Sequence, residues 1–225
     1  AQAGQLAAFL QDHPDTDLRA AGHTLLTGRA QLEHRAVALG HNHQELVNAL
    51  TAIADGTTPT GTGSLDRPVF VFPGQGSQWI GMGAELLDTS PVFAASIANC
   101  QTALAPYIDW NLTDALRGNT DLTRVDIVQP ALFAVMVSLA ELWQSLGIQP
   151  AAVIGHSQGE IAAATVAGAL TLEDGARIAA LRSQAILAIS GQGGMASIPL
   201  PSNETAELLA PWDGRLTIAA HNGPT

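Results

Sequence analysis

Residues 151–164 read AAVIGHSQGEIAAA, a short apolar run that leads through Gly155, Ser157 and Gly159 into an alanine-rich stretch. The apolar run predicts a buried strand, and the continuation GEIAAATVAGAL predicts a helix. The G-x-S-x-G pattern between them is typical of a sharp strand-to-helix turn that exposes a serine hydroxyl. Alone it is a modest signal, because a glycine-flanked turn with an inert serine has the same pattern.

A serine hydroxyl becomes a nucleophile only where a base takes its proton and hydrogen-bond donors stabilise the oxyanion that forms. A strand that turns sharply into a helix supplies part of this geometry, because the first helical N–H groups point toward the developing charge. Here a strand precedes Ser157, and the helix that follows carries small residues that permit close packing on a sheet (Ala162, Ala163 and Ala164). Ser157 is therefore our candidate catalytic residue.

The charge of the 225 residues excludes several classes of partner. Nine arginines, no lysine and twenty acidic residues give a net charge of −11. An acidic protein repels polyanions, so we expect neither nucleic acid nor an anionic membrane as a partner. No run of about 18 uninterrupted apolar residues occurs, and the N-terminus lacks a basic segment followed by an apolar one. We therefore predict a cytoplasmic protein.

Cysteine and histidine follow no metal-ligand spacing. Cys100 is the only cysteine, and we interpret it as a structural thiol on a helix. Five of the seven histidines precede residue 66, at irregular spacings and without an acidic cluster (His13, His23, His34, His41 and His43). We interpret them as solvated surface residues and predict no metal site.

The chain divides at residues 55–67, DGTTPTGTGSLDR, where Gly, Thr and Pro concentrate as they do in a connector. Residues 1–66 are predicted to form a small α/β module. We expect three helices in it and one segment of alternating hydropathy, at 3–11, 17–27, 43–54 and 34–40 respectively.

Residues 67–190 alternate between strands and helices. PVFVF at 68–72 and AAVIG at 151–155 are predicted strands, with helices expected from about Gly83 and over about 126–146. Strands that alternate with helices indicate a parallel sheet covered on both faces. The predicted fold class is therefore α/β, with 67–190 as the large subdomain.

Residues 191–225 differ in composition from what precedes them. A glycine-rich turn is followed by a predicted strand at 195–200, a helix at 202–210 and a second strand at 215–220. This order predicts the start of a second, smaller α/β subdomain. The sequence stops at HNGPT before this subdomain is complete, so we expect the chain to be one piece of a longer polypeptide.

A second glycine-rich loop, PGQGSQW at 73–79, also lies between a strand and a helix, so its N–H groups are expected at the same sheet edge as Ser157. It lacks the Lys-Ser/Thr of a phosphate loop and the spacing of a dinucleotide fingerprint, which makes a phosphate cradle the weaker interpretation. One backbone N–H from this loop, beside that of Gln158, would complete an oxyanion hole.

Arg182 lies in a predicted helix that begins with a capping-box-like Thr171 and Asp174. At helical spacing Ile178, Arg182 and Ile186 share one face. A guanidinium on an apolar stripe is costly unless it is paired. Its partner is either an acidic side chain such as Glu160 or the carboxylate of a substrate, which arginine holds in bidentate geometry.

Six ordered motifs carry a resemblance that covers essentially the whole chain: FVFPGQGSQW, RVDIVQPALFA, AVIGHSQGEIAAA, AALRSQA, GGMAS and AAHNGP. They resemble the acyltransferase domain of a modular type I polyketide synthase, which implies an α/β-hydrolase-like large subdomain and a small ferredoxin-like subdomain. Residues 1–66, including TLLTGRAQLEHRAVALG, resemble the linker between a ketosynthase and that acyltransferase.

The resemblance implies that Ser157 accepts an acyl group from coenzyme A and passes it to the phosphopantetheine thiol of an acyl carrier protein. The thioester is a substrate, so no bound cofactor is expected. Arg182 would hold the carboxylate of the extender unit. The backbone N–H groups of Gln75 and Gln158 would form the oxyanion hole, and three further residues would line the pocket (His156, Gln129 and Asn222).

The resemblance also bears on the extender unit and on the base. RVDIVQ at 124–129 and the glutamine after Ser157 favour methylmalonyl over malonyl. The catalytic histidine of the family lies beyond the AxNGP segment, in sequence that this chain does not contain. Two histidines are poor substitutes, because His156 adjoins the nucleophile along the chain and His221 is expected to line the pocket or to be partly exposed.

Three functions therefore compete. The first is an extender-unit acyltransferase, with 1–66 as a docking and spacing module. The second is a serine esterase or thioesterase, which would also acylate Ser157 with esters that carry no carboxylate. The third is an inactive fragment that serves only as a scaffold, since removing the base removes most turnover.

Overall fold

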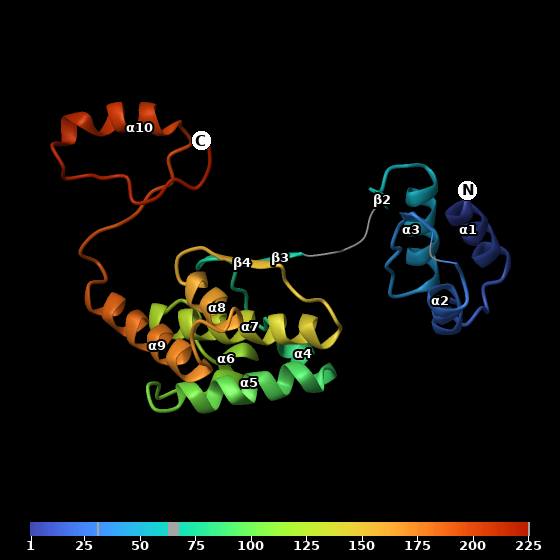
Figure 1. The fold of residues 1–225 in the computed structure, drawn as a ribbon, viewed down its shortest axis with the longest axis horizontal. Helices are drawn as coiled ribbons and strands as arrows, with labels where there is room; N and C mark the ends of the chain where they lie inside the picture. The colour runs from blue at the N-terminus through green and yellow to red at the C-terminus, as the bar shows by residue number, and fades with distance from the viewer. Residues whose placement is uncertain (31, 63–67, 225) are drawn as a thin grey trace. The chain divides into compact units, whose positions relative to one another are not determined.

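The computed structural model describes residues 1–30, 32–62 and 68–224. It contains two compact units, Ala1–Asp66 and Arg67–Thr225, each with a hydrophobic cluster of its own. Figure 1 shows the helices and strands of each unit.

The first unit consists of three helices and a minimal antiparallel ribbon. The helices are α1 (Gln2–Asp12), α2 (Leu18–Thr27) and α3 (His43–Ala54), and the ribbon pairs β1 (His34–Arg35) with β2 (Gly61–Thr62). Its small core lies between α1 and α3 (Ala7, Leu10, Val47 and Leu50). A 2.7 Å hydrogen bond between His43 Nε2 and the Leu10 carbonyl oxygen joins the same two helices.

The three helices predicted for this unit are confirmed, but the alternating segment at 34–40 forms a strand over two residues only. Val37 and Leu39, which follow it, are exposed. A strand extends only as far as a neighbour pairs with it, and β2 offers two residues. This partner lies inside the predicted connector, residues 55–67.

The second unit is built on two parallel strands, β3 (Val69–Phe72) and β4 (Ala152–Gly155). Val69 pairs with Ala152, and Phe72 pairs with Gly155. Both strands were predicted, as was their parallel pairing. Six helices of this unit gather on one side of the strands (Figure 1). They are α4 (Ala84–Thr89), α5 (Pro91–Leu104), α6 (Leu112–Leu116), α7 (Val125–Ser145), α8 (Gly159–Val166) and α9 (Leu172–Ala188).

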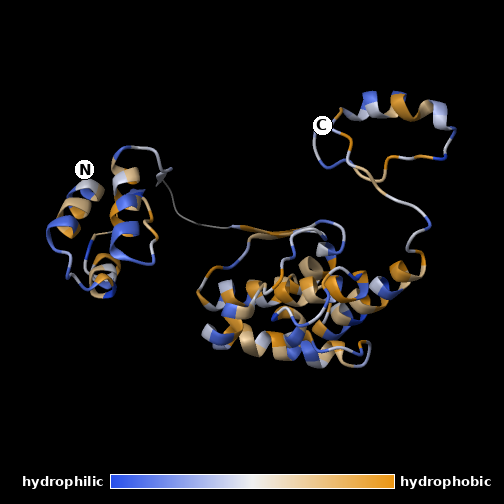
Figure 2. Cartoon of the chain, turned by 180° about the vertical axis from the view of Figure 1, so that it is seen from behind, coloured by the Kyte–Doolittle hydropathy of each residue, from blue (hydrophilic) through white to orange (hydrophobic). Residues whose placement is uncertain are grey.

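The expectation that helices cover both faces of the sheet is wrong for the described part of the chain. Phe70, Phe72 and Val153 face the helices and belong to the core or pack against it. On the other face Val71 is 67% exposed, and Val69 and Ile154 are also exposed. Figure 2 shows both strands as hydrophobic. Helix α8, which follows β4 directly, packs back onto the strands on the same side as the other helices.

Helix α7 runs through the core, in contact with α5, α6, α8 and α9. By length and composition alone it could cross a membrane, but 67% of its most apolar stretch is buried inside the protein. Its apolar surface is therefore that of a core helix. The chain enters α7 at Arg124, whose guanidinium pairs with Asp126 in the first turn.

Beyond α9 the chain forms α10 (Ser202–Leu209) and one short 3-10 turn (Ala210–Trp212). The helix predicted at 202–210 is confirmed. The strands predicted at 195–200 and 215–220 do not form, and neither segment pairs with any described strand. An extended segment becomes a strand only through a hydrogen-bonded neighbour, and an isolated pair is marginal.

The thiol of Cys100 yields a prediction about reactivity. Cys100 lies on α5, is fully buried, and its burial raises its pKa to about 12. Because the thiolate is the reactive form, only roughly one thiol in 10,000 is ionised at pH 8. We expect iodoacetamide at pH 8 to leave Cys100 unmodified in the native chain and to alkylate it fully in urea, as measured by intact mass. Equal alkylation rates in both conditions would contradict the buried position.

Candidate functional site

The turn at Ser157 has the geometry of a nucleophile elbow. Strand β4 ends at Gly155 and α8 begins at Gly159, with Ser157 between them at φ = +54°. The left-handed region is uncommon for a residue with a side chain and marks a locally strained backbone. The turn is held by Gly159 N donating to His156 O at 2.9 Å and by Glu160 N donating to Ser157 O at 3.1 Å.

The two glycines of the motif are required by space. A Cβ on Gly155 would overlap the backbone of Glu160 in the first turn of α8. A Cβ on Gly159 would overlap the carbonyl oxygens of Phe72 and Pro73, at the end of β3. The helix therefore starts in close contact with both strands, and only glycine permits this approach.

The PGQGSQW loop lies directly against the elbow, as predicted. A Cβ on Gly74 would stand 3.0 Å from His156 Nδ1 and 3.4 Å from Ser157 Cβ. His156 N donates to Phe72 O at 3.0 Å, which continues the pairing one residue past the end of β4. Within the loop, Gly76 has φ = +125° and its N–H donates to Gln78 Oε1 at 2.8 Å.

The two backbone N–H groups proposed for the oxyanion hole are both free. Among the described residues, no group accepts a hydrogen bond from Gln75 N or from Gln158 N. Gln158 stands at the N-terminus of α8, where the helix dipole adds to its attraction for negative charge. The hydroxyl of Ser157 is exposed and has no hydrogen-bond partner in the described part of the chain.

Three predicted residues from distant parts of the sequence meet in one hydrogen-bonded chain. Arg182 Nη1 on α9 donates to Gln129 Oε1 on α7 at 2.7 Å, and Gln129 Nε2 donates to Gln75 Oε1 in the loop at 3.1 Å. We call this chain the amide relay. Sequence reasoning had placed Gln75 in the site through its backbone N–H only. The resemblance had placed Gln129 in the pocket without a contact.

Arg182 has a neutral partner. The ion pairs of the described residues are Arg117 with Asp88 and Arg124 with Asp126, and neither involves Arg182. The ion pair considered between Arg182 and an acidic side chain such as Glu160 is therefore absent among the described residues. A half-buried guanidinium without a carboxylate is suited to bind an anion.

The position of Arg182 on its helix differs from the expected apolar stripe. The buried face of α9 consists of small residues (Gly175, Ala176, Ala179, Ala180 and Ser183). Ile178 is exposed, and Arg182 lies at the border between the buried and exposed faces. Ile178, Arg182 and Ile186 share one side of α9, as predicted. The alanines, however, form the buried face of α9, which packs against α5, α7 and α8. The predicted cap is confirmed, since Asp174 N donates to Thr171 Oγ1 at 3.0 Å.

Of the remaining predicted residues, His156 and Asn222 lie at the elbow, and His221 is hydrogen-bonded to a residue outside it. His156 Nε2 and Asn222 Oδ1 share a 3.1 Å hydrogen bond, which places Asn222 beside the residue that precedes Ser157. His221 is exposed and its Nδ1 shares a 2.6 Å hydrogen bond with Ser202 Oγ. In the part of the chain that the structure describes, neither histidine is hydrogen-bonded to Ser157. No group of three or more His, Cys, Asp or Glu residues gathers there as a metal site would require.

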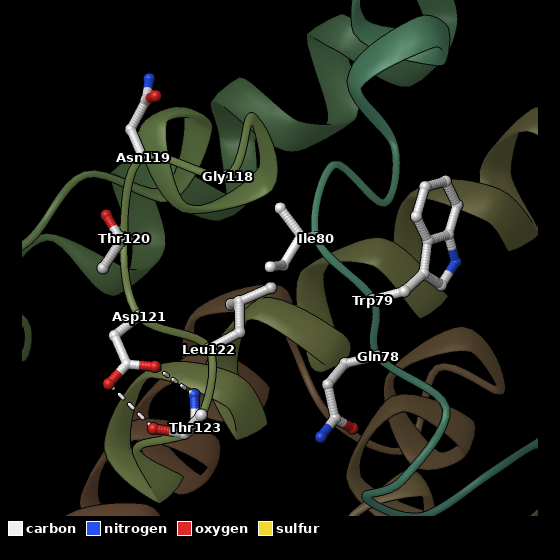
Figure 3. A pocket seen from close by; sticks show the side chains of 9 residues that line it. All are labelled: Gln78, Trp79, Ile80, Gly118, Asn119, Thr120, Asp121, Leu122 and Thr123. Carbon is white, nitrogen blue, oxygen red and sulfur yellow. Dashed lines mark hydrogen bonds between the residues drawn. The ribbon is translucent and has the colours of Figure 1, made fainter.

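A separate pocket of about 460 Å³ opens between two loops of the second unit (Figure 3). The side chains of Ile80 and Leu122 meet inside it, and Trp79 points away. The other lining residues are Gln78, Gly118, Asn119, Thr120, Asp121 and Thr123. Neither Ser157 nor any member of the amide relay lines this pocket, so it is not the candidate site.

Sequence reasoning missed the burial of the Gln158 side chain. It is 1% exposed, and neither its Oε1 nor its Nε2 has a partner among the described residues. A buried amide without a partner costs about 1–3 kcal/mol of stability. No local signal could reveal this, because the neighbours of the side chain come from the tertiary fold.

The unpaired Gln158 side chain generates a stability prediction. Methionine has a similar length and no hydrogen-bonding group to leave unpaired, so Gln158→Met should raise the free energy of unfolding by about 1 kcal/mol. Urea unfolding followed by tryptophan fluorescence measures it, since all four tryptophans follow residue 67. Gln149→Met, at an exposed position, is the control. A lower urea midpoint for Gln158→Met would show that the amide has a partner.

Comparisons with known proteins agree with this architecture. Residues 69–225 match the Acyl transferase domain family, and residues 1–57 match the RhiE-like, KS-MAT linker domain. Erythronolide synthase EryA3 of Saccharopolyspora erythraea is 55% identical over 230 residues, which cover the whole chain and 7% of that protein. Pikromycin polyketide synthase component PikAIII of Streptomyces venezuelae is 53% identical over 229 residues, all of this chain and 14% of that one.

A solved structure extends the likeness to the fold. The acyltransferase domain from module 8 of the salinomycin polyketide synthase superposes with a TM-score of 0.87 at 50% identity, over 99% of this chain and 55% of that one. The chain thus spans about half of that domain structure and a small share of the synthases. The family match covers more than half of the chain and includes both strands, the elbow and the amide relay. The chain belongs to the acyl transferase domain family of the polyketide synthases.

Proposed function

We propose that Ser157 carries an acyl extender unit from coenzyme A to an acyl carrier protein. The observation that carries this proposal is a nucleophile elbow whose neighbouring loop is hydrogen-bonded, through Gln129, to an arginine. Among the described residues, no carboxylate pairs with this arginine. An elbow alone serves many acyl-transfer reactions. An arginine in the same network adds selection for an acyl group with its own carboxylate.

The reaction has two half-reactions that balance. Ser157 Oγ attacks the thioester carbonyl carbon, its proton passes to a base, the C–O bond forms and the C–S bond breaks to release coenzyme A. The base passes this proton to the sulfur of coenzyme A, which leaves as a thiol. The phosphopantetheine thiol of the carrier protein then gives its proton to the base and attacks the carbonyl carbon of the serine ester. A C–S bond forms, the ester C–O bond breaks, and the base returns the proton to Ser157 Oγ. The family resemblance assigns the base to a histidine downstream of the HNGP segment, and His156 and His221 are not assigned that role.

The oxyanion of each tetrahedral intermediate would be held by Gln75 N–H and Gln158 N–H. Both donors are free, and the loop that carries Gln75 packs against Ser157 through Gly74. Preformed donors need no reorganisation as the charge develops, which is why such a pair lowers the barrier by several kcal/mol. Asn222 and His156 would line the same side of the pocket.

The favoured extender unit is methylmalonyl. Arg182 would bind its free carboxylate, and the resemblance associates RVDIVQ at 124–129 and Gln158 with methylmalonyl selection. The buried Gln158 side chain supports a functional reason for a glutamine there, because an apolar residue at a site without partners would cost less stability. An esterase has no need of a guanidinium at this position.

The proposed partners follow from the two units. Residues 1–66 would join the acyltransferase to an adjacent ketosynthase, which is supported by the match of residues 1–57 to a KS-MAT linker. The carrier protein brings the phosphopantetheine, and no cofactor is proposed to reside in this domain. We propose a cytoplasmic location, where coenzyme A thioesters are available.

The test is the mass of the acyl-enzyme. The full-length polypeptide carrying this sequence is mixed with methylmalonyl-CoA, malonyl-CoA or acetyl-CoA, and the Ser157 adduct is followed by intact-protein mass spectrometry. We expect a methylmalonyl adduct that is absent in Ser157→Ala. In Arg182→Ala it should form about 10- to 100-fold more slowly, as expected for the loss of hydrogen bonds between charged groups.

Arg177→Ala is the matched control, because Arg177 is exposed on the same helix and should load as the wild type does. Two results would contradict the proposal. Equal loading of acetyl and methylmalonyl groups, unchanged in Arg182→Ala, would favour the esterase. No adduct with any thioester would favour a scaffold without acyltransferase activity.

A further inference from the structure

The amide relay joins three elements that are far apart in sequence. Gln129 lies on α7, Arg182 on α9, and Gln75 in the loop after β3. Gln129 is the middle member and uses both ends of its amide, Oε1 toward Arg182 and Nε2 toward Gln75. It is therefore in direct contact with the group proposed to bind the substrate carboxylate and with the loop proposed to bind the oxyanion.

The charge of Arg182 fixes the direction of every bond in this chain. A guanidinium has only donors, so the amide of Gln129 must present its oxygen to Arg182. Its NH₂ group is then directed to Gln75, which must present its own oxygen. Each of the two amides could be turned either way on its own, but the charge of Arg182 fixes the orientation of both.

Gln129 is also the most deeply buried member. It is 6% exposed and lies between the fully buried Val128 and Pro130 on the core helix α7. An amide at this depth has no water to replace a lost partner, so both of its hydrogen bonds are strongly favoured. Arg182, by contrast, is half-buried and has a long side chain that a fixed acceptor can orient.

The bond to Gln129 leaves most of Arg182 free for an anion. The guanidinium has five N–H groups, and Gln129 is the acceptor found for it among the described residues, at Nη1. A bidentate carboxylate needs two of the N–H groups that remain. Gln129 and a substrate carboxylate can therefore be bound at the same time.

At its other end, the relay holds the loop next to the nucleophile. The residue before Gln75 packs against Ser157 and His156, and the residue after it donates to Gln78 Oε1. The Gln75 side chain is anchored by Gln129, while its backbone N–H has no acceptor. Loss of the side-chain anchor would let this N–H shift relative to Ser157.

We propose that Gln129 is a positioning residue with two effects: it holds the Arg182 guanidinium for the substrate carboxylate, and it holds the Gln75 loop so that its N–H faces the oxyanion. Carboxylate recognition and stabilisation of the intermediate thus depend on one buried amide. This inference rests on the proposed function of Ser157 and Arg182.

The experiment separates the two effects by substrate. Single-turnover acylation of Ser157 is measured in the full-length polypeptide with methylmalonyl-CoA and with acetyl-CoA, to obtain the saturating rate and the half-saturating concentration for each. Gln129→Leu removes both ends of the relay. Gln75→Met removes only the loop end and keeps the backbone N–H. Gln184→Met is the control, because the Gln184 amide donates to Tyr107 O outside the relay.

We expect Gln75→Met to lower the saturating rate about tenfold for both thioesters without changing either half-saturating concentration. Gln129→Leu should cause the same loss of rate. It should also raise the half-saturating concentration of methylmalonyl-CoA about tenfold, with that of acetyl-CoA unchanged. Gln184→Met should behave as the wild type. A general packing defect would not distinguish the two thioesters in this way.

The inference is overturned if Gln129→Leu loads both thioesters as the wild type does, or if it changes their half-saturating concentrations equally. It is also overturned if Gln75→Met has no effect on the rate. Gln129→Met provides a second test if the leucine variant does not fold. A wild-type protein without any Ser157 adduct would instead refute the proposed function, so the two failures are distinguishable.

Discussion

The left-handed backbone at Ser157 is the constraint on which the second unit depends. A turn this tight brings the first residue of α8 against β3, so that Gly155 and Gly159 have no room for a side chain. The end of β3 must then lie beside the end of β4, which is the parallel register of the two strands. The loop after β3 therefore begins beside the elbow, with Gly74 in contact with Ser157. Backbone strain at one residue thus assembles the edge where the chemistry is proposed to occur.

The helical core positions Arg182 and Gln129, which the elbow itself does not contain. Helices α7 and α9 pack along each other because small residues on α9 permit close approach, and this brings Gln129 and Arg182 within hydrogen-bond distance. The polar chain then continues to Gln75 beside the elbow. The buried amide of Gln129 and the exposed amide of Gln75 link Arg182 to the loop beside the proposed nucleophile. Among the described residues, no acidic side chain pairs with this arginine. In a protein of net charge −11, such an arginine is a local positive charge that is suited to bind an anion.

Local sequence patterns were sufficient to predict the strands, turns and helix ends that depend on residues close together in the chain. The apolar runs predicted β3 and β4, the glycine pattern predicted the turn at Ser157, and Thr171 predicted the start of α9. The parallel pairing of β3 and β4 was also predictable, from the alternation of strands and helices. Other features that depend on distant residues were not. The segments 195–200 and 215–220 have strand-like sequence but no partner strand among the described residues. Val71 lies in an apolar run that was expected to be covered on both faces, but its side chain is exposed. The contact between Gln75 and Gln129 and the burial of Gln158 likewise depend on tertiary packing, for which one sequence has no signal.

The central claim is that Ser157, the two backbone donors and Arg182 bind one acyl group together. The most direct measurement is a crystal structure of the full-length polypeptide trapped as its methylmalonyl-Ser157 ester. The account predicts the ester carbonyl oxygen about 2.7–3.1 Å from both Gln75 N and Gln158 N, with the carboxylate paired to Arg182 and Gln129 still bound to both neighbours. An ester whose carbonyl oxygen faces solvent, or whose carboxylate lies away from Arg182, would contradict it.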